Sequence, residues 1–357
     1  MGQIYKNATL TISATCAKTV HDGFLHPRNK VKPSVRLAIS LPSRTLGTVA
    51  LVGRTEELLS GPLDLRGWVL QEALLSRRRL IYEENELLWH CQSIQSEALI
   101  SSNIVYVNYS EIQLPPQVFG ISTLDIDSTS ANDDRIYLWS RIVENYSRRK
   151  LTDRDDYPTA VVGVASELSK AWGDNYYGGL WAAFMIPSLC WHRVKTSIPL
   201  VDEAHSPSWS WLSITAPVIM LDRVFPRSFT KVLEYPHDTS IPYDWMAASR
   251  SIMHTGRIIL WGPLIPLHPR DAWEDTDSMF PNTNIWYDDD RMEESVPMSE
   301  LQLLIMGSSI SGDANLYALL LLPMVNNVYK RIGKLDLYVN TRAGELFKKS
   351  EQRVTII

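Results

Sequence analysis

Two short segments bring cysteine and histidine together, and these residue types could bind a metal ion or form a nucleophile–base pair. They are His90-Cys91 and Cys190-Trp191-His192, which in principle offer the four ligands of a zinc site. His90 and Cys91, however, lie in a stretch that we predict to be a strand, where neighbouring side chains point to opposite faces. We therefore expect no metal site, and no other residue pattern supports a Cys–His nucleophile pair.

Arginine residues could bind a phosphate group. Arg66 stands at the start of a predicted helix, where its guanidinium and the N-terminal amides could hold a phosphate together; the alternative is a salt bridge that orients the helix. The runs Arg77-Arg78-Arg79 and Arg148-Arg149-Lys150 each follow a helical pattern, so we expect them to stabilise a helix C-terminus. The sequence contains no GxSxG, HExxH, Walker or GxGxxG motif.

The composition indicates a folded chain with a large core. A length of 357 residues suggests about two domains, and 45% hydrophobic residues with twelve tryptophans argue against disorder. The net charge of −5 gives no general attraction to nucleic acid. Three cysteines without CxxC spacing argue against a disulfide framework and fit a reducing, cytoplasmic location. No apolar stretch is long enough to span a membrane.

Residues 1–100 are expected to contain short strands and one helix. Alternation of Leu10, Ile12 and Ala14 with polar residues predicts a strand in the segment 2–14. A helix should follow Pro62, with apolar residues on one face: Trp68, Leu70, Leu74 and Leu75. Residues 80–82 and 87–91 flank four polar residues, which predicts a β-hairpin.

Residues 101–132 are polar and contain Pro115-Pro116, so we interpret them as a linker before a second region, 133–357. Helical spacing predicts helices over 133–149, 158–172 and 179–188. Short apolar runs at 257–261, 301–306 and 316–322 predict a mostly antiparallel β region, in which the acidic stretch 271–294 is a solvated loop. Residues 207–211 should begin a strand that Trp209 and Trp211 anchor, with a tryptophan-lined ligand pocket as the alternative.

Several segments, in order along the chain, resemble motifs of the fungal heterokaryon-incompatibility (HET) domain. The segment 1–14 is similar to the middle motif of that domain, through Tyr5, Asn7 and Ala8. Three further segments resemble the closing motif of that domain: Arg66-Gly67-Trp68-Val69-Leu70-Gln71-Glu72, the residues 75–82, and, at its end, Trp89-His90-Cys91. Segments 146–152, 160–165, 179–181, 207–211 and 329–333 resemble the region that follows HET domains in many fungal proteins.

The resemblance implies an α+β chain. Residues 1–100 would be the C-terminal half of a HET domain, a partial TIR-like or flavodoxin-like α/β core, followed by a helical segment and a mostly antiparallel β region. The family's first motifs, of the Leu-Ser-Tyr-x-Trp-Gly and Cys-Ile-Asp-Gln types, are not found. We therefore expect an N-terminal truncation within the domain, which would leave strand edges unpaired.

The resemblance also implies a function: a signalling or effector protein that triggers programmed cell death after non-self recognition. Its partners would be other incompatibility proteins or further copies of itself, without nucleic acid, membrane span or cofactor. The missing motifs leave an inert paralogue or gene fragment as an alternative.

The relation to TIR domains implies a further alternative, an NAD-consuming hydrolase. Glu72 would stabilise an oxocarbenium-like transition state, with Arg66 and Gln71 as ligand-binding neighbours. A structural role remains open for each: Glu72 could pair with Arg66 or with an arginine of the run 77–79. Gly67 would allow close packing, and Trp68 would belong to the core.

Overall fold

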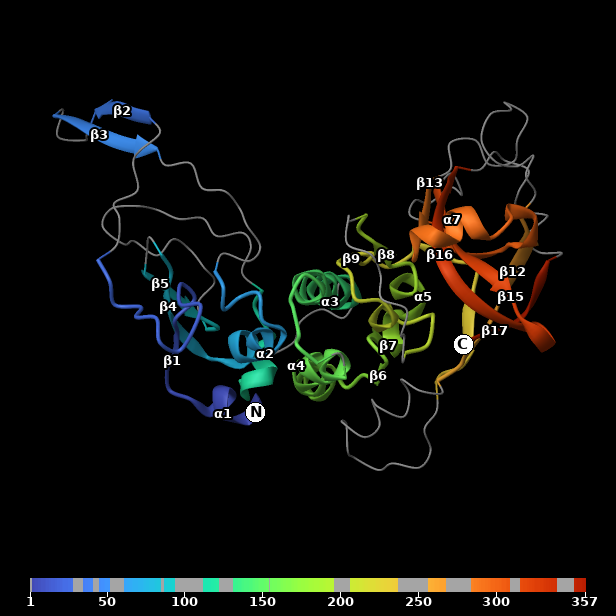
Figure 1. Cartoon of the computed structure of the whole chain (residues 1–357), viewed down its shortest axis with the longest axis horizontal. Coiled ribbons are helices and arrows are strands. Elements are labelled where there is room, and N and C mark those ends of the chain that lie inside the picture. Colours follow the sequence, from blue (N-terminus) through green and yellow to red (C-terminus); the bar gives the residue numbers. More distant parts are fainter. Residues whose placement is uncertain are drawn as a thin grey trace. The chain divides into compact units, whose positions relative to one another are not determined.

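A computed structural model of the chain describes these residues: 2–27, 35–40, 45–51, 61–84, 87–93, 112–121, 131–153, 155–195, 206–236, 256–267, 284–308, 315–338 and 350–357. The chain forms two compact units, 1–119 and 120–357, each considered below by itself (Figure 1). The division falls inside the segment 101–132. Helices and mostly antiparallel strands make the chain mixed α/β, as predicted.

The first unit is organised around one helix and three strands. Strand β1 (Thr11–Ser13) pairs in parallel with β4 (Arg78–Tyr82), and helix α2 (Gly67–Leu75) precedes β4 in the connection between them. Strand β4 continues into β5 (Leu87–Cys91) as an antiparallel hairpin, with Tyr82 opposite Leu87. The predicted hairpin is therefore confirmed, and it forms one sheet with β1.

The segment 2–14 differs from the prediction. Its first part is helix α1 (Gly2–Asn7), and in β1 the buried residue is Ser13, while Ile12 is 57% exposed. Two hydrogen bonds explain this inversion: the hydroxyl groups of Ser76 and Thr11 are 2.8 Å apart, and Arg79 Nε donates to Ser13 Oγ at 3.3 Å. Polar contacts, and not the apolar alternation, thus decide which face of β1 turns inward.

The first arginine run was also interpreted wrongly. Helix α2 ends at Leu75, and Arg78 and Arg79 belong to strand β4, because the chain enters the strand within two residues of the helix. Arg77 turns away from the helix end: its Nη2 donates to the carbonyl of Phe119 at 2.6 Å, and its guanidinium lies 5.7 Å from the Phe119 ring. The second run, 148–150, directly follows the helix α3 described below.

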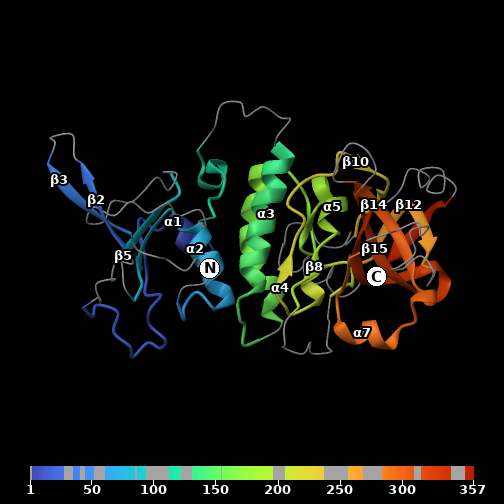
Figure 2. The same ribbon diagram turned by 90° about the horizontal axis from the view of Figure 1, so that it is seen from above.

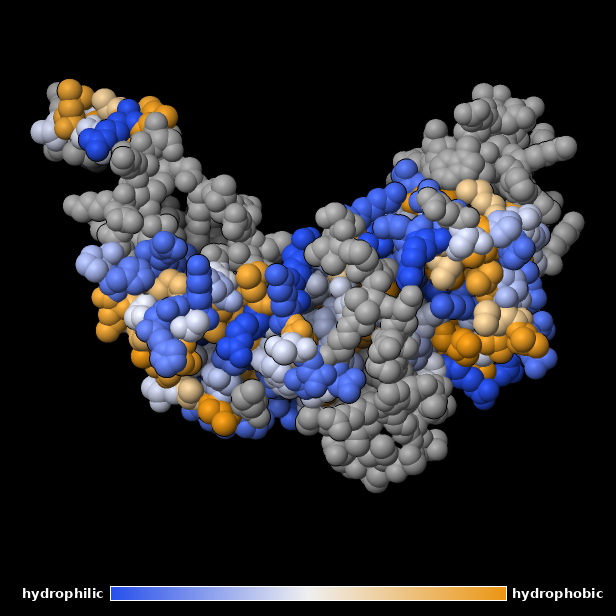
Figure 3. Space-filling model, viewed as in Figure 1, coloured by the Kyte–Doolittle hydropathy of each residue, from blue (hydrophilic) through white to orange (hydrophobic). Residues whose placement is uncertain are grey.

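A separate hairpin in the first unit joins β2 (Val35–Ser40) to β3 (Leu46–Leu51), with Leu37 opposite Val49. Alternate residues of β2 (Val35, Leu37 and Ile39) are apolar and exposed. Hydrophobic surface is accordingly visible on this hairpin in Figure 3.

Two long helices begin the second unit, α3 (Ala131–Ser147) and α4 (Asp156–Trp172). The apolar faces that the sequence predicts are confirmed, because the inward residues are almost fully buried: Ile136, Trp139, Ile142, Val143, Tyr146, Val161, Val164, Ala165 and Leu168. Trp172, expected on the same face, is only half-buried.

The predicted third helix, 179–188, is mostly wrong. A short hairpin, β6 (Tyr176–Tyr177) with β7 (Leu180–Trp181), is followed by a 3-10 turn, η2 (Ala182–Phe184), and only then by one turn of helix, α5 (Met185–Ser188). Gly178 and Gly179 form the hairpin turn with φ angles of 50° and 99°. Such angles suit glycine and are incompatible with a helix.

The segment 207–211 is not a strand either. Trp211 begins a 3-10 turn, η3 (Trp211–Ser213), which the Ser210 hydroxyl caps by accepting a hydrogen bond from the amide of Leu212. The anchoring role is confirmed, because Trp209 and Trp211 are fully buried. The indole of Trp209 donates to the carbonyl of Gly256 at 2.9 Å, which satisfies its one donor.

A closed barrel forms the last part of the second unit. It contains β12 (Ile258–Pro266), β14 (Gln302–Ser308), β15 (Asn315–Pro323), β16 (Val328–Tyr338) and β17 (Glu351–Ile356). Strand β12 closes it, because its first half pairs with β17 and its second half with β14. The predicted antiparallel region is confirmed, apart from the parallel pair of β16 and β17. Short strands at the edges are β10 (Arg227–Ser228), β11 (Lys231–Glu234) and β13 (Asn284–Tyr287).

Both faces of the barrel wall are buried along much of β14, β15 and β16. Inside lie apolar residues such as Leu303, Leu320 and Leu335. On the alternate positions, Leu304 and Leu319 are also fully buried. Figures 1 and 2 show that α5, with the short strands β8 (His192–Arg193) and β9 (Val218–Ile219), lies between the α3–α4 pair and the barrel.

The acidic stretch 271–294 is not simply a solvated loop. Its residues from 284 onward form strand β13 and the first part of helix α7 (Asp290–Ser295), and Asp288 between them is buried. The reason is the pairing of β13 with β16, in which Trp286 lies opposite Lys334. Residues 271–283 lie outside the described part. No helix among the described residues is long and apolar enough to cross a bilayer.

Candidate functional site

The two HET-like segments of the first unit meet at Tyr5 and Glu72. Helix α1 packs on α2, and the Tyr5 hydroxyl donates a hydrogen bond to the Glu72 carboxylate. Burial, and then this hydrogen bond and the negative charge of Glu72, raise the pKa of Tyr5 to about 12. The contact joins residues that are far apart in the sequence and that both belong to the resemblance.

The helix that carries Glu72 is also tied to strand β1. The Ser76 hydroxyl lies 2.7 Å from the Glu72 carbonyl and 2.8 Å from the Thr11 hydroxyl. Farther along, Gln92 donates to the carbonyl of Leu74 at 3.2 Å. Glu72 thus sits, half-buried, on a helix whose position is set by side-chain hydrogen bonds at its C-terminal end.

The other expected ligand-binding residues lie in different environments. Gln71 is buried beneath α1: a Cβ atom on Gly2 would lie only 2.7 Å from Gln71 Nε2. Arg66 is exposed at the N-cap position of α2, and Gly67 next to it is buried. Trp68, expected in the core, is only half-buried. The structure therefore brings Tyr5 to Glu72 but does not gather Arg66 and Gln71 on one open surface.

The remaining motif residues surround these helices. Asn7 is exposed at the end of α1, and the Ala8 amide donates to the Tyr5 carbonyl at 3.2 Å. Trp89 and Cys91 are half-buried on β5. Among the described residues, no group of three or more histidine, cysteine, aspartate or glutamate side chains is placed to hold a metal ion.

A second polar site, in the second unit, was not predicted. Its centre is Arg331 on β16, which is fully buried and stacks on the Trp191 ring at 3.4 Å from its centroid. Arg331 Nη2 donates to the Trp191 carbonyl at 2.5 Å, and Nη1 lies 3.1 Å from Asp288 Oδ2. The backbone amide of Arg331 donates to Ser208 Oγ at 2.9 Å.

A bulge in β16 places its charged residues together. The register with β15 shifts by one residue between Gly333, opposite Leu320, and Arg331, opposite Leu321. Without the shift, Arg331 and Lys334 would point to opposite faces of the strand. With it, Arg331, Lys334 and Asp336 share the outer face, while the residues between them contribute to the barrel interior.

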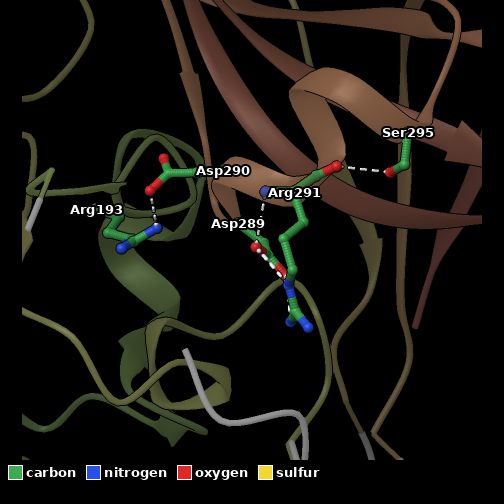
Figure 4. Close-up of polar contacts among 5 residues, drawn as sticks. All are labelled: Arg193, Asp289, Asp290, Arg291 and Ser295. Carbon is green, nitrogen blue, oxygen red and sulfur yellow. Dashed lines mark hydrogen bonds and ion pairs between the residues drawn. The ribbon is translucent and has the colours of Figure 1, made fainter. Parts of the chain in front are cut away.

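Two more ion pairs complete this site. Lys334 Nζ lies 3.2 Å from Asp336 Oδ1 and 4.8 Å from the centroid of the Trp286 ring. Arg193 on β8 donates from Nη1 to Asp290 Oδ2 at 2.9 Å, as Figure 4 shows. In the same view, Asp289 caps α7 and holds Arg291 instead, so neighbouring carboxylates serve different arginines.

The buried charges of this site shift pKa values in opposite directions. Burial raises the pKa of Asp288 to about 6, even though Arg331 and other cations lower it. Burial, and then the charges of Lys334 and Arg331, lower the pKa of His192 to about 3. Burial also raises the pKa of the Cys190 thiol to about 12, so this cysteine is a poor nucleophile.

The sequence held one signal for this site. In the segment 330–337, charged and apolar residues alternate only from Lys334 to Leu337, and the interval of three between Arg331 and Lys334 breaks the period of two that a regular strand requires. Such a break is what a bulge produces. The contacts with Trp191 and Asp288 could not be inferred in this way, because both are distant in the sequence.

No protein-family model, no curated protein and no solved structure matches the chain. The function proposed below therefore rests on its own residues and on the HET-like motifs.

Proposed function

We propose that this chain is a protein of the fungal HET incompatibility type, in which the residues 1–100 signal for programmed cell death after recognition of non-self. One observation carries the proposal. The two segments that resemble HET motifs, 1–14 and 66–82, fold onto each other, with β1 beside β4, α1 on α2, and the Tyr5 hydroxyl on Glu72. The resemblance requires these two segments to belong to one unit, and their packing meets this requirement.

The arrangement of these strands also supports a TIR-like or flavodoxin-like origin for the first unit. A parallel pair of strands connected through a helix is the element from which such sheets are built. Here β1 and β4 are the parallel pair, and α2 lies in the connection. On this proposal the second unit restrains or senses, and the partners are other incompatibility proteins or further copies of the chain, in the cytoplasm.

Expression of the chain from an inducible promoter in a filamentous fungus tests the proposal. The readout is the fraction of cells that take up a vital dye after induction. We expect death with the wild-type chain and clearly less with Glu72→Gln and Tyr5→Phe, since each removes the hydrogen bond that joins the two motifs. Loss of one such bond to a charged group costs about 1.5–3 kcal/mol.

Glu84→Gln is the matched control, because Glu84 is an exposed glutamate on the turn of the same unit. It should kill as efficiently as wild type at equal protein levels. Survival of cells that accumulate folded wild-type chain would contradict the effector role. Equal killing by all three variants would show that the Tyr5–Glu72 contact is not needed for signalling.

A second candidate function is NAD hydrolysis with Glu72 as the catalytic carboxylate. The observation that favours it is the environment of Glu72: a half-buried carboxylate, held by a phenol, can stabilise positive charge on a ribose without diffusing in solution. Cellular NAD content after induction separates this candidate from signalling alone. A fall in NAD that Glu72→Gln abolishes and Glu84→Gln preserves would support it, and constant NAD during cell death would exclude it.

A further inference from the structure

Among the described residues of the second unit, three cations are buried, and each is deeper than the carboxylate that pairs with it. Side-chain exposure is 0% for Arg331 against 11% for Asp288, and 3% for Arg193 against 50% for Asp290. For Lys334 it is 4% against 31% for Asp336. Since water screens the outer carboxylates more than the inner cations, the interior of this cluster has an excess of positive potential.

Several donors of these cations are left over after the ion pairs are made. Arg331 Nε and Arg193 Nε are buried and have no hydrogen-bond partner among the described residues. Buried polar groups of native proteins normally have partners, so this concentration of unused donors points to a ligand.

We propose that the outer face of β16 together with β8 forms a binding site for a compact oxyanion, such as a phosphoryl group, held by Arg331 and Arg193, which both lie close to Asp288. The site is called the β16 oxyanion site below. Guanidinium groups offer pairs of N–H donors in the geometry that phosphate and sulfate oxygens accept. The stacking of Arg331 on Trp191 fixes the plane of those donors in advance.

The carboxylates at the site set how an anion would enter. Asp290 is half-exposed and already occupies Arg193, so an incoming oxyanion competes with it. Asp288 is buried next to Arg331 and has one oxygen, Oδ1, without a partner among the described residues. Burial holds the pKa of Asp288 at about 6, so its carboxylate can take up a proton as an anion binds. The oxyanion site is separate from the proposed function, because the proposed function concerns the first unit and neither proposal depends on the other.

Calorimetric titration of the full chain with inorganic phosphate and with sulfate is the test. Sulfate keeps its charge between pH 6 and pH 8, so any change in its affinity over that range comes from the protein. We expect both anions to bind at constant ionic strength, and sulfate to bind more tightly at pH 6 than at pH 8, because binding is linked to protonation of Asp288. Chloride at equal ionic strength should not compete.

Variants distinguish this site from other basic surfaces. Arg193→Gln should weaken sulfate binding about 10- to 100-fold, the effect of losing a hydrogen bond to a charged group. Asp290→Asn should strengthen it, because the competing carboxylate is gone. The matched control is Arg353→Gln, which removes an exposed arginine paired with Glu234 on the same barrel and should leave affinity unchanged.

Adenosine monophosphate distinguishes the source of the phosphoryl group. Equal affinity for the nucleotide and for phosphate would indicate a free oxyanion, and tighter nucleotide binding would indicate a larger phosphorylated ligand. Absence of binding of phosphate, sulfate and the nucleotide at 10 mM would overturn the proposal, as would binding that Arg193→Gln and Asp290→Asn both leave unchanged. The cluster would then be a set of structural ion pairs that joins β8 to the barrel.

Discussion

Acidification from pH 7 to pH 5 should have opposite effects on the stability of the second unit through two groups, His192 and Asp288. Burial places the folded pKa of His192 at about 3, below its ordinary value of 6.5, and that of Asp288 at about 6, above its ordinary value of 3.8. Whichever state of the chain binds more protons gains stability as the pH falls. The two groups can therefore be separated by substituting one at a time.

His192 favours the unfolded chain in acid. Between pH 6.5 and pH 3, the unfolded chain binds a proton at this imidazole and the folded chain does not. The free energy of unfolding must therefore decrease as the pH falls through this window. Integration of the linkage relation from pH 7 to pH 5 gives a loss of about 2 kcal/mol.

Asp288 acts in the other direction. Between pH 6 and pH 3.8, the folded chain binds a proton at this carboxyl and the unfolded chain does not, so stability increases as the pH falls. The same relation gives a gain of about 1 kcal/mol between pH 7 and pH 5. Together, these two groups should thus lower the stability by only about 1 kcal/mol between pH 7 and pH 5, because their contributions partly cancel.

Urea unfolding followed by tryptophan fluorescence measures this effect in buffers without phosphate or sulfate. Ten of the twelve tryptophans lie after residue 120, so the signal reports mainly on the second unit. His192→Phe keeps an aromatic ring against Trp286, 5.0 Å away in the wild type, but cannot bind a proton. From pH 7 to pH 5 it should lose about 2 kcal/mol less stability than the wild type, whereas Asp288→Asn should lose about 1 kcal/mol more than the wild type.

Each comparison is made within one variant, between its own values at the two pH values, so a general destabilisation does not disturb it. If His192→Phe loses as much stability in acid as the wild type, then His192 does not titrate as the structure requires. If Asp288→Asn has the pH dependence of the wild type, the carboxyl is not protonated in the folded chain near pH 6.

Two further predictions concern packing and reactivity. Gly179→Ala should lower the free energy of unfolding in urea by about 3 kcal/mol or more, since φ is 99° and a Cβ would lie 2.5 Å from Trp211 Nε1. Gly173→Ala, with φ of 63° and nothing within 4 Å of its Cβ, should lower it by only about 1–2 kcal/mol. Equal losses in the two variants would refute the steric argument. In the native chain, Ellman's reagent should modify the half-buried Cys16 and Cys91 but not Cys190, because the Cys190 thiol is buried and its pKa is raised to about 12. Rapid reaction of all three thiols without denaturant would contradict this prediction.

Local patterns in the sequence predicted those elements that a single apolar face determines. The helices α3 and α4 and the hairpin of β4 with β5 follow from such patterns, because burial of one face repeats with the period of the element. The three barrel strands β12, β14 and β15 were identified from their short apolar runs for the same reason. Trp209 and Trp211 were correctly expected to be buried, although their segment is a turn and not a strand.

Predictions failed where long-range polar contacts outweigh local pattern. Ile12 is exposed and Ser13 buried because Ser13 accepts a hydrogen bond from Arg79, which no local pattern contains. The helix expected over 179–188 does not form, because Gly179 provides a carbonyl for the indoles of Trp139 and Trp211, both at 2.9 Å. A satisfied buried indole stabilises the fold more than a few residues of helix propensity.

The division between local pattern and long-range contacts also applies to the site around Glu72 and to the site around Arg331. The sequence by itself determined the HET-like motifs, and with them the choice of Tyr5 and Glu72, since a motif is a property of residue order. Only the tertiary structure showed that Tyr5 contacts Glu72 and that Gln71 lies beneath α1. Likewise, only folding brings Trp191, Asp288 and Arg331 together, because a bulge and the pairing of β13 with β16 set their positions. Buried charge depends on which distant residues exclude water, and residue order alone does not specify this.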